Sequence, residues 1–166
     1  GDLNAGDTID ATVTGNVVKS KLIAGGALTL FADGKVSNCE LTAETTLTLS
    51  TGGNVVRSQL IAGSTLDVSV GGSVLKSQLL PANTLVANIA GDLVGSLLSN
   101  VDGAGVATNV DGIQLAVGGV VASTGIDSGQ GVIITNAVSI GDDVIIKSAR
   151  DANLTVGGEV GARILA

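Results

Sequence analysis

The sequence predicts an all-β protein, a single-stranded parallel β-helix that forms a solenoid of about 19 residues per coil. A nineteen-residue unit is repeated five times without a gap over residues 4–98. Apolar and polar residues alternate inside each unit, which is the period of a half-buried strand rather than of a helix. Glycine recurs at one fixed position of every unit. Units that repeat in this way cannot bury their apolar face alone, so we expect them to stack on their neighbours.

The first predicted strand of each unit occupies positions 6 to 10, counted from residue 4. Positions 6, 8 and 10 are mostly apolar or small, and the residues between them are mostly polar. Position 6 is aliphatic in all five units: Ile9, Leu28, Leu47, Leu66 and Leu85. We expect these side chains to form one buried column, with the intervening side chains facing outward. A structure with Leu47 and Leu66 on opposite surfaces would contradict this prediction.

Three corners separate the predicted sides of a coil. The first is the recurring glycine at position 12, where the backbone needs either a positive φ or the absence of a Cβ. A short side follows at position 14, and the three-residue step to position 17 implies a second bend. The third side alternates at positions 17, 19 and 2, and glycines at position 3 mark the last corner. A three-sided coil of this length favours a right-handed β-helix over the left-handed kind, which repeats every six residues.

The regular coils are predicted to cover residues 1–98, after which the register slips. Residues 99–112 are expected to form an irregular coil or a loop excursion from the rod, where binding functions often reside. Residues 113–166 are expected to continue the β-helix with shorter, less regular coils. This expectation rests on two local matches, one between residues 112–123 and 58–69, and one between residues 138–144 and 154–160 at a spacing of sixteen.

Composition excludes several classes of partner. The formal net charge is −7 and the eight Lys and Arg residues are scattered, so we expect no binding of nucleic acid. Residues 79–98 carry one charge and would pass a crude filter for a membrane helix, but they keep the register of the unit before them, so no membrane span is predicted. A single cysteine and no histidine leave no disulfide framework, no metal motif and no predicted cofactor.

Two groups of residues could carry chemistry. Cys39 is the only thiol, but a nucleophile needs a base, and Cys39 replaces serine in a column of small residues, so we expect it to be buried and inert. Asp142 and Asp143, with Lys147 and Arg150 nearby, have the composition of a catalytic acid pair. Their position predicts corner residues instead. We therefore expect no catalytic, cofactor-binding or metal-binding residue, and no enzyme.

A basic column lies at position 16. Lys19, Arg57 and Lys76 form it, and Asn38 and Gly95 interrupt it. The pattern is typical of a solvated ridge.

The segments GGALTL at residues 25–30 and AGSTLDVSVGG at residues 62–72 resemble the repeat regions of filamentous-haemagglutinin-like exported adhesins. The resemblance covers about residues 4–98 and implies a long right-handed β-helix on a bacterial surface. The asparagine ladder of those adhesins is missing apart from Asn16 and Asn54 at position 13. The segment GDLVGSLL at residues 91–98 resembles bactofilin-type cytoskeletal polymers, whose coils are shorter and more charged.

The function expected from this reading is a non-enzymatic structural scaffold of the cell surface, such as an adhesin shaft, a stalk or a filament subunit. No polar or helical cap is visible near Gly1 or at residues 164–166. Uncovered β-helix ends favour addition of further coils. The expected partner is therefore the protein itself, stacked head to tail, or the rest of a longer chain, with a surface glycan or protein as a further candidate. The alternatives are an intracellular bactofilin-like polymer and a β-helical polysaccharide-cleaving enzyme.

Overall fold

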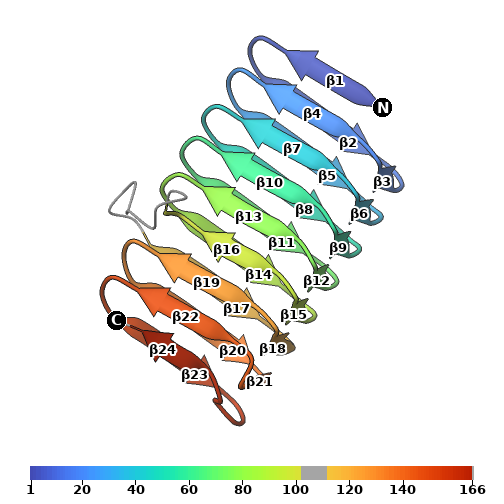
Figure 1. Ribbon diagram of the computed structural model, residues 1–166. Coiled ribbons are helices and arrows are strands. Elements are labelled where there is room, and N and C mark those ends of the chain that lie inside the picture. Colours follow the sequence, from blue (N-terminus) through green and yellow to red (C-terminus); the bar gives the residue numbers. More distant parts are fainter. Residues whose placement is uncertain (102–111, 166) are drawn as a thin grey trace.

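The computed structural model describes residues 1–101 and 112–165, and in these residues the protein is an all-β solenoid of stacked coils (Figure 1). From β1 to β21, each coil places one strand in each of three parallel sheets before the chain returns to the first sheet, and between β23 and β24 only an isolated bridge from Val160 to Ile140 takes the place of the third strand. The predicted fold class and the three-sided coil of roughly 19 residues are confirmed. The two chain ends lie at opposite ends of the stack (Figure 1). The right-handed sense stays a prediction.

The sheets, named A, B and C here, contain nine, eight and seven strands. Sheet A is built from β1 (Asp2–Ala5), β4 (Lys21–Ala24), β7 (Glu40–Ala43), β10 (Gln59–Ala62), β13 (Gln78–Pro81), β16 (Leu97–Ser99), β19 (Gly125–Ser128), β22 (Ile145–Ser148) and β24 (Arg163–Leu165). Sheet B is built from β2 (Ile9–Val13), β5 (Leu28–Ala32), β8 (Leu47–Thr51), β11 (Leu66–Val70), β14 (Leu85–Ile89), β17 (Ile113–Val117), β20 (Val132–Ala137) and β23 (Ala152–Val156). Sheet C is built from β3 (Val17–Val18), β6 (Val36–Ser37), β9 (Val55–Val56), β12 (Val74–Leu75), β15 (Leu93–Val94), β18 (Val120–Ala122) and β21 (Ser139–Ile140).

Equivalent residues of successive coils pair with each other. Leu66 of β11 pairs with Leu47 of β8 on one side and with Leu85 of β14 on the other. Partners in the first five coils are one nineteen-residue unit apart throughout, as in the pairing of Val36 with Val55 in sheet C. The predicted vertical registration is therefore confirmed, and it places chemically alike side chains over one another along the axis.

The interior is a continuous aliphatic column. The inward positions 6, 14 and 19 are buried in every one of the five regular units, and positions 8, 10, 17 and 2 are buried in all units after the first. The only aromatic residue, Phe31, lies outside this core and is 47% exposed on sheet B. Because each fully buried Leu or Val stabilises the fold by about 1.5 to 3 kcal/mol, the stacked columns are the main source of stability.

The glycine corner at position 12 depends on close approach of the coils. The N–H of Gly53 donates to the carbonyl of Gly34, 3.1 Å away, and the next coil repeats the bond between Gly72 and Gly53. A Cβ on Gly53 would lie 2.8 Å from the backbone nitrogen of Lys35, so only glycine fits there without a shift. No glycine of this column has a positive φ. Of the two reasons expected for glycine at position 12, the absence of a Cβ is therefore the correct one, and a positive φ is not.

The coil after residue 98 is longer than the others. Leu85 of β14 pairs with Ile113 of β17, and Asp92 is bonded to Val120, so this coil is nine residues longer than a regular unit. The predicted excursion over residues 99–112 falls on this coil, but residues 102–111 lie outside the described residues. Before them, the buried side-chain amide of Asn100 accepts a hydrogen bond from the N–H of Gly129 and donates one to the carbonyl of Asn83.

Two register predictions for the C-terminal part are wrong. The match of residues 112–123 with 58–69 would align Ile113 with sheet A, but Ile113 begins a strand of sheet B. Ile140 bridges Val160 at an offset of 20, not sixteen. Other offsets here are 18 to 20, so coil length varies by one residue on either side of the regular nineteen. The local matches misled because the same alternation of apolar residues before glycine occurs on more than one side of a coil.

Coil length changes by single residues at two places in this part of the chain. Val121 pairs with Ile140 and Ile126 pairs with Ile146, so one residue is added at the corner between β21 and β22. Within β20, the register with β23 shifts between Ile134 and Ala137. Asn136, inside this irregularity, has a φ of 64°. The shift is a β-bulge, which takes up an extra residue while the sheet continues on both sides of it.

The apolar stretch over residues 79–98 forms strands β13 to β16, as the repeat predicts. Among the residues that the structure describes, there is no helix with the length and hydropathy needed to cross a membrane.

Candidate binding groove

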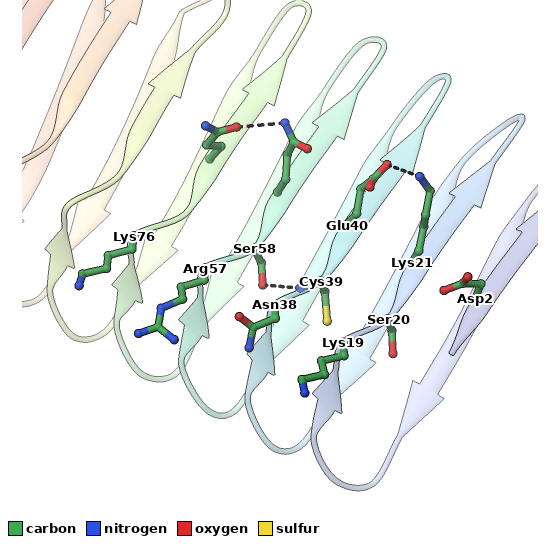
Figure 2. Close-up of a pocket in the computed structure, with 12 residues that line it drawn as sticks. Asp2, Lys19, Ser20, Lys21, Asn38, Cys39, Glu40, Arg57, Ser58 and Lys76 are labelled. Carbon is green, nitrogen blue, oxygen red and sulfur yellow. Dashed lines mark hydrogen bonds and ion pairs between the residues drawn. The ribbon is translucent and has the colours of Figure 1, made fainter.

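An open groove of about 620 Å³ runs along the second bend of the first coils. One side is the position-16 column, formed by Lys19, Asn38, Arg57 and Lys76. The other side is the outward row of sheet A that begins with Asp2, Lys21, Glu40, Gln59 and Gln78. Figure 2 shows the position-16 side chains in one row, each contributed by a successive coil.

The position-16 residues share an uncommon backbone conformation. Their φ angles are 49° at Lys19, 54° at Asn38, 48° at Arg57, 51° at Lys76 and 64° at Gly95. This left-handed conformation makes the chain bend from the two-residue strand of sheet C into sheet A, which confirms the second bend. It costs a residue with a Cβ roughly 1 to 2 kcal/mol, and Gly and Asn tolerate it best. Three coils nevertheless place Lys or Arg there, and all three side chains are exposed.

A ladder of hydroxyl groups lies under the groove. The Oγ of Ser58 accepts a hydrogen bond from the N–H of Cys39, and the Oγ atoms of Ser77 and Ser96 accept from the N–H groups of Ser58 and Ser77. The donor–acceptor distances are 3.1 to 3.2 Å. Each of these three hydroxyls also donates to the carbonyl two residues earlier, such as Ser77 to Leu75 at 3.0 Å. The ladder satisfies the buried polar groups of the bend and so holds the position-16 column in place.

Charge in the groove differs in sign from that of the whole chain. The groove contains four of the eight cationic side chains and two carboxylates, a balance of +2 in a chain of −7. The Nζ of Lys21 lies 2.9 Å from a carboxylate oxygen of Glu40, and the amide of Gln59 donates to that of Gln78. In residues 1–101 and 112–165, no salt bridge involves Lys19, Arg57 or Lys76. Their charges therefore face solvent along one line.

Cys39 lies at the floor of this groove. It is 4% exposed, and its Sγ donates to the carbonyls of Val17 and Ser37 at 3.4 and 3.3 Å. The prediction that Cys39 is a buried small residue is confirmed. In the hydroxyl ladder, its sulfur atom stands where the other coils have a serine hydroxyl, and sulfur is a weak hydrogen-bond acceptor.

The paired aspartates occupy a different corner. The N–H and the hydroxyl of Ser123 both donate to the carboxylate of Asp143, the N–H at 2.9 Å. The hydroxyl first, and then the N–H, hold the pKa of Asp143 below its ordinary value. Asp142 is exposed beside it, while Lys147 lies 4.0 Å from Asp127. The corner assignment of the two aspartates is confirmed. Ser123, the partner of Asp143, was missed because the register was misjudged in this part of the chain.

A second ladder follows the first corner, at position 13. Asn16 accepts from the N–H of Lys35, Asn54 from that of Ser73, Ser73 from that of Asp92, and Asp92 from that of Val120. The distances are 2.8 to 3.0 Å. A continuous ladder of asparagines was not expected, but a ladder of mixed residue types is present, because Asn, Ser and Asp at position 13 all accept a backbone hydrogen bond from the following coil. Each of these side-chain oxygens binds the backbone of the following coil, which is a structural role.

Comparison with known proteins adds no family: no protein-family model, no curated protein and no solved structure matches the chain. Within the described part of the chain, no group of three or more His, Cys, Asp or Glu residues is placed to hold a metal ion. The groove along the position-16 column is therefore the candidate site on geometric and electrostatic grounds.

Proposed function

We propose that the protein is a non-enzymatic structural scaffold of the cell surface, such as an adhesin shaft, a stalk or a filament subunit. The observation that carries the proposal is the unbroken pairing of sheet A from β1 to β24. Nine strands spaced about 4.8 Å apart make a stack of roughly 38 Å. Every coil is hydrogen-bonded to its neighbours and shares their core, so the body resists bending and acts as a spacer.

Addition of further coils is the second part of the proposal. The outermost coils expose side chains from the core columns: Leu3, which pairs with Leu22, is 49% exposed, and Ile164, which pairs with Ile146, is 47% exposed. Unpaired strand edges with apolar cross-sections favour addition of another parallel coil. The coil that adds belongs either to a longer chain or to a second copy stacked head to tail.

Stacking is tested by sedimentation and negative-stain electron microscopy of the 166-residue chain across a range of concentrations. We expect fibres that lengthen with concentration. The variant L3K/I164K, with a charge in the core cross-section at each end, should remain monomeric. The matched control V18K/I145K adds the same charges on the exposed flanks and should still form fibres. A monomer at the highest concentration would contradict stacking between copies and leave only the continuous longer chain.

The cell-surface location is tested separately. Antibodies against the chain should label intact source cells, and protease added outside should remove the label. Filaments found only inside the cell would favour the bactofilin-like alternative. Release of oligosaccharides from a polysaccharide by the purified chain would favour the enzyme.

A further inference from the structure

The position-16 column combines positive charge with an unfavourable backbone conformation. Lys19, Arg57 and Lys76 adopt the left-handed conformation. The other regular coils place Asn38 and Gly95 at the same position, and these two residue types adopt that conformation most readily. Backbone strain retained at a row of exposed cations is typical of a site selected for binding rather than for stability. We propose that the groove binds an acidic polysaccharide laid along the solenoid axis.

The lining of the groove indicates a ligand that carries both oxyanions and hydroxyl groups. The guanidinium of Arg57 can bind a carboxylate or a sulfate with two parallel hydrogen bonds. The amides of Asn38, Gln59 and Gln78 lie among the cations and can donate to or accept from hydroxyls. The one aromatic side chain, Phe31, belongs to sheet B and cannot stack a sugar ring in this groove. A neutral glycan therefore lacks its usual platform, and the ligand must be held by charges of its own.

The spacing of the cations fits a polymer with widely separated charges. Arg57 and Lys76 are one coil apart, about 4.8 Å, and Lys19 and Arg57 are two coils apart. Duplex DNA carries one charge per roughly 1.7 Å of its axis, which is denser than this row can match. The net charge of −7 also repels such a dense polyanion. A single nucleic-acid strand would need aromatic residues for its bases, and the groove contains none.

An acidic peptide fits the groove less well than a glycan. Peptide and protein partners gain most of their affinity from aromatic or aliphatic anchors in desolvated pockets. This groove is open to solvent and lined by charged, amide and hydroxyl groups, with Cys39 buried below them. A chain of sugars presents the complementary groups on its surface without needing an anchor. The charged groups of the glycan are carboxylates or sulfates, and the test separates the two.

The test uses the 166-residue chain and fluorescently end-labelled oligosaccharides at low ionic strength. The probes are a polygalacturonate fragment, which carries only carboxylates, a heparin fragment, which also carries sulfates, and a neutral dextran fragment. The variant K19N/R57N/K76N removes the free cations and changes the net charge from −7 to −10. Asparagine suits the left-handed conformation, as Asn38 shows, so this variant should melt at the same temperature as the parent or higher.

The matched control K35Q/R150Q/R163Q makes the same change in net charge at exposed cations outside the groove. We expect at least one acidic oligosaccharide to bind the parent and to lose affinity as salt rises. Three exposed ion pairs lost together should weaken binding roughly tenfold in the groove variant, and the control should stay within about twofold of the parent. Binding of the polygalacturonate fragment identifies carboxylate as sufficient, and binding of the heparin fragment alone identifies sulfate as required.

Three results would overturn the inference. The first is no binding of either acidic oligosaccharide at low ionic strength, and the second is an equal loss of affinity in the groove variant and the control. The third is binding of polyglutamate or single-stranded DNA of the same length as tightly as the glycans, with the same dependence on the groove cations. None of these results bears on the scaffold function, whose tests use fibres and cell-surface labelling.

Discussion

Replacing Ser77 by alanine should lower the free energy of unfolding by about 1 to 3 kcal/mol, because one hydroxyl serves two coils. Ser77 is 1% exposed. Its Oγ accepts from the N–H of Ser58 at 3.2 Å and donates to the carbonyl of Leu75 at 3.0 Å. That carbonyl also accepts from the N–H of Arg57, so it keeps a partner in the variant. The N–H of Ser58 loses its side-chain acceptor inside the fold, and a buried unpaired donor costs about 1 to 3 kcal/mol.

The assay combines urea denaturation with amide hydrogen exchange resolved to single residues. Solenoid stability is a sum of coil and interface contributions, so the effect should be largest near the substitution. We expect the amide of Ser58 to exchange much faster in the variant, with smaller changes several coils away. Ser69→Ala is the matched control, because Ser69 belongs to the same repeat unit but is exposed on sheet B, and it should change stability by less than about 0.5 kcal/mol.

The reasoning is refuted if the Ser77 variant is as stable as the Ser69 variant and the exchange of the Ser58 amide is unchanged. In that case the hydroxyl ladder would be a packing feature without energetic weight. Faster exchange at every amide to the same extent would also count against the account, because it would mean loss of global stability without a local defect at the bend.

Three further substitutions test other parts of the fold. Gly53→Ala should cost about 1 to 3 kcal/mol in thermal unfolding because its Cβ meets the coil before it, while Gly15→Ala in the same column has open space and should be neutral or better. Cys39→Ser should add about 0.5 to 1.5 kcal/mol by restoring a good acceptor to the ladder, and no change in melting temperature would contradict this. Asp143→Ala should destabilise the protein near neutral pH. Because the folded state lowers the pKa of Asp143, its ionised carboxylate stabilises the fold at pH values above the ordinary pKa of the group. This contribution is lost as the pH falls through the lowered pKa, so the stabilities of parent and variant should converge in acid. Asp142→Ala is the matched control, because it removes none of the hydrogen bonds from Ser123, and it should change stability near neutral pH by less than the Asp143 variant does.

The regular coils could be predicted from the sequence because their information is repeated. One unit leaves the strand period ambiguous, but Leu47, Leu66 and Leu85 at the same position of three units establish the column and its pairing together. Parallel pairing in register follows directly, since any slip by one residue would place these side chains in solvent. The same argument assigned residues 79–98 to strands despite their high hydropathy.

The register after residue 98 could not be predicted, for a physical reason. Without a gapless period, a short apolar alternation before glycine fits sheet A or sheet B equally well, and Ile113 was assigned to the wrong one. The residue added at the corner of Asp142 and Asp143 and the bulge near Asn136 leave no mark in the local pattern. Pairing between coils determines these features, and a comparison of short sequence segments gives no information about that pairing.

The sequence predicted the basic residues of the groove but not their backbone conformation. The basic column of Lys19, Arg57 and Lys76 was found, but it was interpreted as a solvated ridge. The Lys and Arg residues gave no sign of the left-handed backbone, because these residue types do not suggest a positive φ. A retrospective signal was Asn38 and Gly95 in the same column, since these two types together are typical of that conformation.

The two corners of a coil show how one spacing determines several residue choices. Asn16 and Asn54 at position 13 direct oxygens at the coil that follows, so a Cβ on the glycine beneath each would lie within 2.3 Å of an oxygen. Lys35 supplies no such oxygen, yet a Cβ on Gly53 would still meet its backbone nitrogen at 2.8 Å. Glycine is therefore required by the distance between coils itself, and the ladder occupies space that the missing Cβ leaves. At the second bend no Cβ clash excludes a side chain, but the left-handed backbone favours Gly and Asn, so Lys19, Arg57 and Lys76 occupy that corner at a cost in conformational energy.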